Sequence, residues 1–400
     1  MRSLPALGVV LLLLAALPVR SATVLVLRFH NASQNADLSW VGESVSEVLR
    51  AELSASSAIV LDRETRAEAM KRMSLRPDAD FTKATLIRLG QSVDADYILY
   101  GSYETKPGAA SASGKADIRD SSLDIVARTI DLRKLHDGPE VSETGKLSDL
   151  AKLEEHLAWE EVKYIDPHSD PQLDKFLASQ KLTRADAQES YVRGLLSASN
   201  EQRQKWFTQA ATLDPKYVSP AFEMGKLLLE RKEYKQAITW FQRVPPTDER
   251  YPEARFRMGL AAYGALDYAA AANYFREVAK IYPLNEVYNN LGAAEEALNQ
   301  PGAIDDYRRA LEGDPNDAVY LFNLGAALLK KNSFDEAAKR LDAAVGHDAN
   351  DEEAASLLAQ AQEKLGAEPG SKAVAARLKQ NFDATAFRQL KAMLAPKGGS

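Results

Sequence analysis

The sequence of 400 residues predicts a small N-terminal α/β sheet domain followed by an all-α superhelical solenoid of repeated helix pairs. Two observations predict this division. Strand-like and helix-like segments alternate over residues 22–165, which favours a sheet covered by helices. Further along the chain, Gly225, Gly259, Gly292 and Gly325 are spaced by 34, 33 and 33 residues, and a fixed period of this length is typical of stacked helical repeats.

The first 21 residues have the pattern of an export signal. Arg2 supplies a positive charge, residues 4–19 form an apolar run, and Ser21 is a small residue at the expected cleavage point. The run is shorter than the ~20 residues that a membrane-spanning helix needs. We therefore expect a periplasmic or secreted chain without an integral membrane span after cleavage, and the alternative is a signal retained as an anchor.

Composition narrows the function classes. The chain has no cysteine, which excludes disulfides, thiolate metal sites, cysteine nucleophiles and a lipid-modified N-terminal cysteine. The formal net charge of -7 argues against a nucleic-acid partner, because such a protein needs a basic face. The sequence shows no catalytic motif and no histidine pair at metal-ligand spacing, so we expect no catalytic residues, no cofactor and no metal.

Hydrophobic patterning places the elements of the first domain. Alternating or continuous apolar runs predict strands, and apolar positions at helical spacing predict helices. Ser148 is expected to cap the last helix of this domain. The segment 106–121 is rich in Gly, Ala and Ser and is expected to be a mobile loop. Strands are predicted at 23–30, 58–61, 96–103, 123–132 and 140–146, and helices at 39–53, 65–73, 82–93 and after Ser148.

The order of these motifs resembles the N-terminal domain of TolB-like and FlgO-like bacterial proteins. The similarity is carried by Gly42 near the start of the first helix, the stretch 96–102, the pair Ile130 and Asp131, and Gly138 in a turn. This resemblance implies a periplasmic or envelope adaptor domain, here residues 22–165, without catalytic residues. Residues 166–186 are predicted to be a linker, because two prolines within five residues disfavour a helix.

The repeated frame over residues 187–366 resembles the tetratricopeptide repeat (TPR). Each glycine is followed at fixed distances by an alanine and by a large residue, which is typical of helices in close contact. We expect about five repeats plus a terminal helix, and residues 367–400 are expected to form a C-terminal helix and a disordered tail. The structural repeat positions are Gly225, Gly259, Gly292, Gly325, Ala237, Ala271, Ala303, Ala337, Phe241, Phe275 and Tyr307.

The resemblance to TPR proteins implies a concave face, lined by the first helix of each pair, that binds a protein or peptide. Because these positions are mostly apolar, an apolar peptide or a partner helix is the favoured ligand. An alternative for Phe222, Phe256 and Phe322 is packing between helices. The predicted partner-binding residues are Phe222, Lys226, Phe256, Leu260, Tyr263, Asn289, Glu296 and Phe322.

Together these patterns predict a non-enzymatic exported adaptor or scaffold that binds a protein or peptide partner. The alternatives are a regulatory subunit with a small ligand in the N-terminal α/β domain, or an enzyme of unrecognised type.

Overall fold

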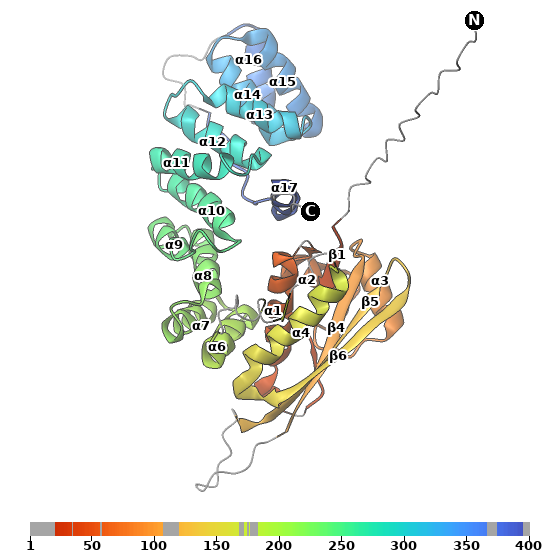
Figure 1. Ribbon diagram of the computed structural model, residues 1–400. Helices are drawn as coiled ribbons and strands as arrows, with labels where there is room; N and C mark the ends of the chain where they lie inside the picture. The colour runs from red at the N-terminus through yellow and green to blue at the C-terminus, as the bar shows by residue number, and fades with distance from the viewer. Residues whose placement is uncertain are drawn as a thin grey trace, which may run out of the picture.

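The computed structural model describes residues 21–33, 35–56, 58–106, 120–167, 172–173, 176, 183–365 and 374–394 (Figure 1). Nearly all of the predicted export signal and of the loop predicted at 106–121 lies outside these residues. The same holds for most of the predicted linker and for the tail from residue 395 onwards. Within the described part of the chain, no helix combines the length and apolar character that a membrane span requires.

The N-terminal domain is built on one mixed sheet. Strand order is β3-β1-β4-β5-β6, and β2 pairs with β4 in addition. β1 runs parallel to β3 and β4, whereas β4, β5 and β6 are antiparallel neighbours. The predicted run 23–30 is divided into two short strands. The strands are β1 (Thr23–Val26), β2 (His30–Asn31), β3 (Ile59–Val60), β4 (Tyr97–Lys106), β5 (Ser122–Asp131) and β6 (His136–Lys146).

Helices cover both faces of the sheet, which gives three layers. Val24 and Val26 of β1 face a core shared with α1 (Val41–Ala55) and α4 (Leu150–Ile165). Leu25 and Leu27 point to the opposite face, where they pack with residues of α2 (Arg63–Arg72) and α3 (Lys83–Gln91). Successive side chains of a strand alternate between faces, so a strand with apolar residues at every position is buried on both sides.

The predicted cap of the last helix is wrong. Ser148 lies inside a 3-10 turn, Leu147–Asp149, and α4 begins only at Leu150. Asp149 occupies the capping position, and its side chain accepts no capping hydrogen bond. Leu147 is buried in the core directly after β6, so packing of this leucine fixes the turn that precedes the helix.

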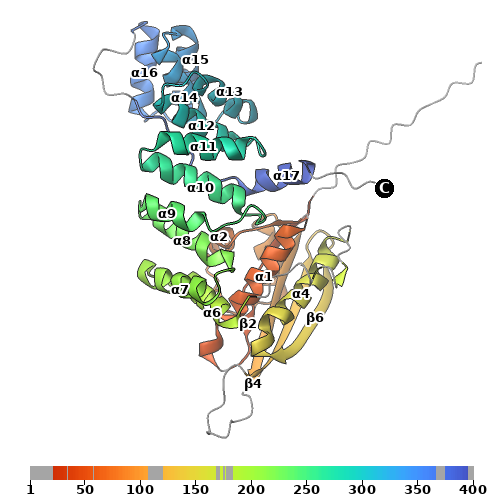
Figure 2. The same cartoon turned by 60° about the vertical axis from the view of Figure 1, so that its left-hand side comes forward.

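The C-terminal part is a stack of antiparallel helix pairs (Figure 2). In the described residues, five pairs are followed by α16, and α17 is not part of a pair. The helices are α6 (Ala185–Leu196), α7 (Asn200–Leu213), α8 (Val218–Glu230), α9 (Tyr234–Phe241), α10 (Tyr251–Gly264), α11 (Tyr268–Ala279), α12 (Asn285–Ala297), α13 (Ala303–Gly313), α14 (Ala318–Lys330), α15 (Phe334–His347), α16 (Glu352–Gln362) and α17 (Ala384–Leu394).

The periodic glycines lie where the two helices of a pair meet. A Cβ atom at Gly225 would lie 2.6 Å from Cδ1 of Phe241, and one at Gly259 would lie 2.5 Å from Cε1 of Phe275. Both distances are below any normal carbon–carbon contact, so the ring of the second helix occupies the space of the missing side chain. The glycine and the aromatic residue therefore fix the approach of the paired helices.

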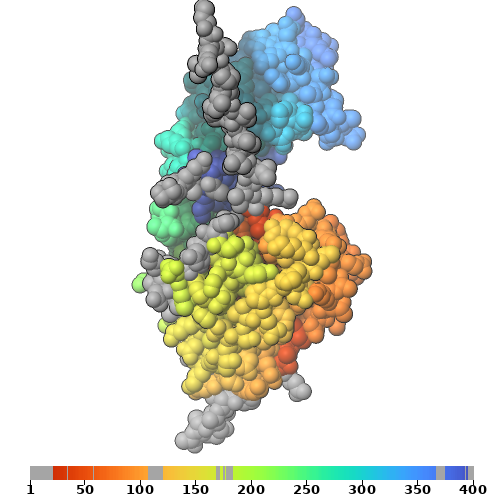
Figure 3. All heavy atoms as spheres, turned by 45° about the vertical axis from the view of Figure 1, so that its right-hand side comes forward, coloured from red at the N-terminus to blue at the C-terminus, as the bar shows by residue number. Residues whose placement is uncertain are grey.

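The sheet domain and the array form two lobes (Figure 3). Residues of α6 bind both lobes together. Gln188 of α6 donates from Nε2 to Ser44 Oγ at 2.7 Å and to Glu154 Oε2 at 2.5 Å. Ser44 belongs to α1 and Glu154 to α4, and all three residues are buried. Arg193, also on α6, donates to the main-chain oxygen of Asp37 at 2.9 Å. One apolar core runs from the sheet into the first helix pairs.

Candidate peptide-binding face

Residues 374–383 run as an irregular segment along the first helices of the later pairs and lead into α17 (Figure 2). We call residues 377–382 the docked segment. The surface that receives it is called the docking face, and it is formed by the first helices α10, α12 and α14 together with the start of α16. Its residues are Phe256, Glu286, Asn289, Asn290, Asp317, Phe322, Asn323, Asp351 and Glu353.

Two asparagine side chains hold the main chain of the docked segment. Asn323 donates from Nδ2 to Arg377 O at 2.7 Å and accepts at Oδ1 from Arg377 N at 2.8 Å. Asn290 does the same with Lys379, at 2.8 Å for both bonds. An asparagine amide has one donor side and one acceptor side, so it can satisfy both main-chain groups of one residue. The segment is thereby fixed at every second residue.

A third asparagine connects Asn290 and Asn323, the two residues that hold the main chain of the docked segment. Asn289 is fully buried, and its Nδ2 donates to Asn290 Oδ1 and to Arg377 O, both at 3.0 Å. Its Oδ1 accepts from Asn323 Nδ2 at 2.8 Å. Buried amides without partners would cost free energy, and here each finds its partners in the other asparagines and in the segment. The three side chains therefore act as one polar network.

Acidic residues of the docking face receive the basic side chains of the segment. The Arg377 guanidinium binds both carboxylate oxygens of Asp351 and contacts Glu353 Oε2 at 2.9 Å. It also lies over the ring of Phe322, 3.4 Å from the ring centroid, in a cation–π contact. Lys379 Nζ is 2.6 Å from Asp317 Oδ2. The hydrogen bond from Arg377 holds the pKa of Asp351 below its ordinary value.

The segment ends in an aromatic cluster. The ring of Phe382 lies 5.6 Å from that of Phe256 on α10 and 5.5 Å from that of Phe387 on α17, measured between centroids. Phe387 in turn meets Tyr282 edge-on at 4.7 Å. Aromatic rings at these separations attract one another beyond the area they bury. The docked segment thus runs from α14 through α12 to α10, opposite to the order of the repeats.

α17 connects the docked segment to the sheet domain. Arg388 donates from Nη1 to the main-chain oxygen of Val60 in β3 at 3.0 Å. Lys391 Nζ lies 3.8 Å from Glu249 Oε2, in the connection between α9 and α10. The chain from residue 374 to 394 therefore contacts the last repeats, the middle of the array and the edge of the sheet.

The predicted partner-binding residues fall into two groups. Phe222, Phe256, Leu260, Asn289 and Phe322 are buried, whereas Lys226, Tyr263 and Glu296 are partly exposed. Phe222 packs edge-on against Phe241 within its own pair, as in the alternative considered from the sequence. Phe256, Phe322 and Asn289 lie at the docking face, where they contact the docked segment.

Asn290 and Asn323 were not among the residues predicted from the sequence, and the predicted face was mostly apolar, whereas the docking face is largely polar. The two asparagines stand two residues before Gly292 and Gly325, and therefore at the same position of consecutive repeats. That recurrence was the signal that could have identified them. The corresponding residues of the two preceding repeats are Glu223 and Arg257.

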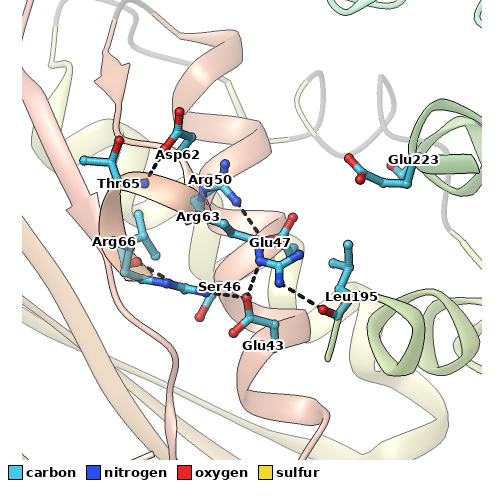
Figure 4. A network of polar contacts seen from close by, with 12 residues as sticks. Glu43, Ser46, Glu47, Arg50, Asp62, Arg63, Thr65, Arg66, Leu195 and Glu223 are labelled. Atoms are coloured by element: carbon cyan, nitrogen blue, oxygen red, sulfur yellow. Dashed lines mark hydrogen bonds and ion pairs between the residues drawn. The ribbon is translucent and has the colours of Figure 1, made fainter. Parts of the chain in front are cut away.

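A second polar cluster lies where the sheet domain meets the first helix pair (Figure 4). Arg66 of α2 donates to Glu43 Oε1 at 2.5 Å, and Arg63 Nε lies 3.3 Å from the same oxygen. Arg63 also donates from Nη2 to Leu195 O of α6 at 3.1 Å. Burial alone would raise the pKa of Glu43, but the two arginines outweigh it and hold the pKa below its ordinary value. These contacts join structural elements and leave Glu43 ionised.

On α4, burial raises the pKa of carboxyl groups, whereas the pKa of Glu43 is lowered. Burial raises the pKa of Glu154 to about 8, although Ser44 and Gln188 oppose the change. Burial likewise raises the pKa of Glu161 to about 7, and Thr129 donates to this carboxyl at 2.7 Å. The half-buried side chain of His156, also on α4, contacts Glu143 and stacks on Trp159.

Comparison with known families identifies the repeats. Residues 292–361, from within α12 to within α16, match the family model described as tetratricopeptide repeat. The repeat type predicted from the glycine register is thereby confirmed. No curated protein matches the chain.

Several solved structures resemble parts of the chain. YrrB, described as a TPR protein with an unusual peptide-binding site, is 19% identical; the match covers 44% of this chain and 92% of that one, with a TM-score of 0.38. MamA from Desulfovibrio magneticus RS-1 is 22% identical over 41% of this chain and 95% of its own, also with a TM-score of 0.38. Lipoprotein GNA1162 from Neisseria meningitidis is 20% identical over 31% and 80%, with a TM-score of 0.25.

Proposed function

We propose that this chain, whose C-terminal part carries tetratricopeptide repeats, is an exported, non-enzymatic adaptor that binds a protein or peptide partner on the first helices of its array. The sheet domain then places the array within the periplasm or envelope.

One observation carries this proposal. Asn290 and Asn323 pair with both main-chain groups of an irregular segment, which is how a folded surface holds an extended peptide. Two asparagine side chains in this arrangement are suited to bind a polypeptide, because they recognise its repeating main-chain groups. They offer no comparable set of contacts to a small molecule.

Export is supported by the position of the sheet relative to the predicted cleavage point. The main-chain oxygen of Ala22 accepts a hydrogen bond from Ile59 N at 2.8 Å, so sheet contacts begin directly after Ser21. Mass spectrometry of the chain produced in a bacterial host tests this part. A mature N-terminus at Ala22 in the periplasmic fraction is expected, and a chain that retains Met1 in the cytoplasm would contradict export.

Site-specific photo-crosslinking tests partner binding in the full chain. A photoreactive benzoylphenylalanine replaces Tyr263 or Glu296, which are partly exposed on α10 and α12. The control position is Lys235, an exposed residue on the second helix α9. We expect the same partner protein to be crosslinked from both first-helix positions and not from Lys235. Equal crosslinking from all three positions, or none from any, would contradict the proposal.

A further inference from the structure

We infer that the docking face is a binding site for an extended peptide of the pattern Arg-x-Lys-x-x-Phe, and that a partner with this pattern replaces residues 377–382 of the chain itself. The inference rests on the proposed function and names the chemistry of the ligand.

The first step is the recognition of the main chain. Arg377 and Lys379 are two residues apart, and in an extended chain such residues present their main-chain groups in the same direction. Asn323 and Asn290 bind those groups with four hydrogen bonds of 2.7 to 2.8 Å. This part of the recognition does not depend on the ligand's side chains, so any extended peptide can satisfy it.

The second step is selection by charge and shape. Asp351 and Glu353 meet the first basic side chain, and Asp317 meets the second. A planar guanidinium fits the first position best, since it binds the Asp351 carboxylate through two nitrogens while lying over Phe322. Phe256 receives the aromatic ring at the third position. The spacing of these sites gives the pattern Arg-x-Lys-x-x-Phe.

Only part of the array carries asparagines at the position that binds the peptide main chain. In the two preceding repeats Glu223 and Arg257 replace the asparagines. Each pairs within its own helix, Glu223 with Lys226 at 3.2 Å and Arg257 with Glu253 at 2.7 Å. An ionised glutamate side chain only accepts and an arginine side chain only donates, so neither can bind both main-chain groups of one residue as an asparagine does. Main-chain recognition is therefore confined to α12 and α14.

The docked segment is held in a way that allows another peptide to replace it. It is joined to the docking face mainly by hydrogen bonds and ion pairs, and the side chains of Arg377 and Lys379 remain 30% and 32% exposed. Phe382 is its deeply buried apolar side chain. A segment tethered to its own binding site competes at an effective concentration of the order of mM. A peptide in trans therefore binds weakly until the segment is released.

The experiment uses the full chain and a released variant, Arg377→Glu with Lys379→Glu and Phe382→Ala. The probe is a fluorescein-labelled synthetic peptide with the sequence of residues 374–383, VAARLKQNFD, followed by fluorescence anisotropy. We expect the released variant to bind the probe at least tenfold more tightly than the unmodified chain. The control variant Lys331→Glu with Lys339→Glu reverses two exposed charges on the array and should behave like the unmodified chain.

Two further comparisons test which groups of the chain and of the probe form the binding site. In the released variant, Asn290→Leu with Asn323→Leu keeps the side-chain size and removes the main-chain hydrogen bonds, so probe binding should fall at least tenfold while the circular dichroism spectrum is retained. A probe with alanine in place of its arginine and lysine should bind at least tenfold more weakly. Equal probe affinity of the released variant and the unmodified chain, or of the released variant with and without the leucines, overturns the inference.

The crosslinking experiment, repeated in the released variant so that the docked segment does not compete, separates this inference from the proposed function. A partner crosslinked from Tyr263 and Glu296, combined with no probe binding to the released variant, overturns the ligand class and leaves the adaptor function standing. Probe binding without a crosslinked partner supports the ligand class and contradicts the adaptor function.

Discussion

Asn323 and Arg377 are 54 residues apart in the sequence, and the side-chain amide of the first holds both main-chain groups of the second. Asn323 is 1% exposed, so water does not compete for these hydrogen bonds. The pair fixes the register of the docked segment, because Lys379 then lies opposite Asn290.

Asn323→Asp is expected to lower the free energy of unfolding by about 1–3 kcal/mol. A carboxylate cannot donate a hydrogen bond, so Asn289 Oδ1 loses its donor in a buried place and Arg377 O keeps only the hydrogen bond from Asn289. Urea unfolding measures the change. The matched control is Asn316→Asp at an exposed position, which should change stability by less than about 0.5 kcal/mol. Equal effects of the two substitutions would show that the amide pair contributes nothing.

Phe275→Ala is expected to destabilise the chain by about 3–5 kcal/mol, because it removes a large, fully buried ring and leaves a cavity. The ring packs against Gly259 and lies 5.7 Å from the ring of Phe256. Thermal and urea unfolding check the value. Ile281→Ala, at a residue that is 58% exposed, is the control. A loss below about 0.5 kcal/mol at Phe275 would contradict the repeat register.

Local patterns in the sequence were sufficient to predict most elements of the fold. The alternation in β5 and the continuous apolar residues of β1 depend on neighbours a few positions away, so they can be recognised without the tertiary structure. The start of α4 could not be predicted in this way. The start of α4 is set by the packing of Leu147 into the core. This packing places Ser148 inside a 3-10 turn, where it does not cap the helix.

The docking face could be predicted only in part. Asn289, Phe256 and Phe322 were identified because they stand three residues before a periodic glycine. Residues 377–382 carry no repeat period, and the asparagines that hold their main chain lie 54 and 89 residues away in the sequence. Only the folded array brings Asn290 and Asn323 to the same side, so the polar character of the face is a tertiary property.

Glu154→Gln is expected to stabilise the chain at pH 9 and to stabilise it less at pH 6. The pKa of Glu154 is raised to about 8 in the folded chain, above its ordinary value of 4.5. Its contribution to stability is thus complete below about pH 4.5 and is lost as pH rises through 8, because ionisation of a buried carboxyl is costly. A neutral amide does not ionise and avoids this loss.

Melting temperatures between pH 6 and pH 9 measure this effect. The unmodified chain should lose stability over this range more steeply than the Glu154→Gln variant. Part of the slope should remain in the variant, since burial also raises the pKa of Glu155 and Glu161 to about 7. Glu363→Gln, at an exposed residue, is the control and should leave the slope unchanged. Parallel curves for Glu154→Gln and the unmodified chain would contradict the assignment.

Glu43→Gln is expected to destabilise the chain by about 3–5 kcal/mol, because it leaves Arg66 buried without its carboxylate. Chemical unfolding at pH 7 measures the loss. Glu140→Gln provides the comparison, since the pair of Glu140 with Arg128 is exposed and such pairs contribute at most about 1 kcal/mol. A similar loss for both variants would show that burial does not distinguish the two pairs.

Hydrogen exchange over residues 374–383 tests most directly whether the chain holds its own segment on the array. The amide hydrogens of Arg377 and Lys379 are bonded to Asn323 and Asn290, so mass spectrometry of the full chain should show exchange slowed about a hundredfold relative to an unstructured peptide. The variant Asn290→Leu with Asn323→Leu should exchange there at nearly the unstructured rate. Unslowed exchange in the unmodified chain would contradict the docking of this segment.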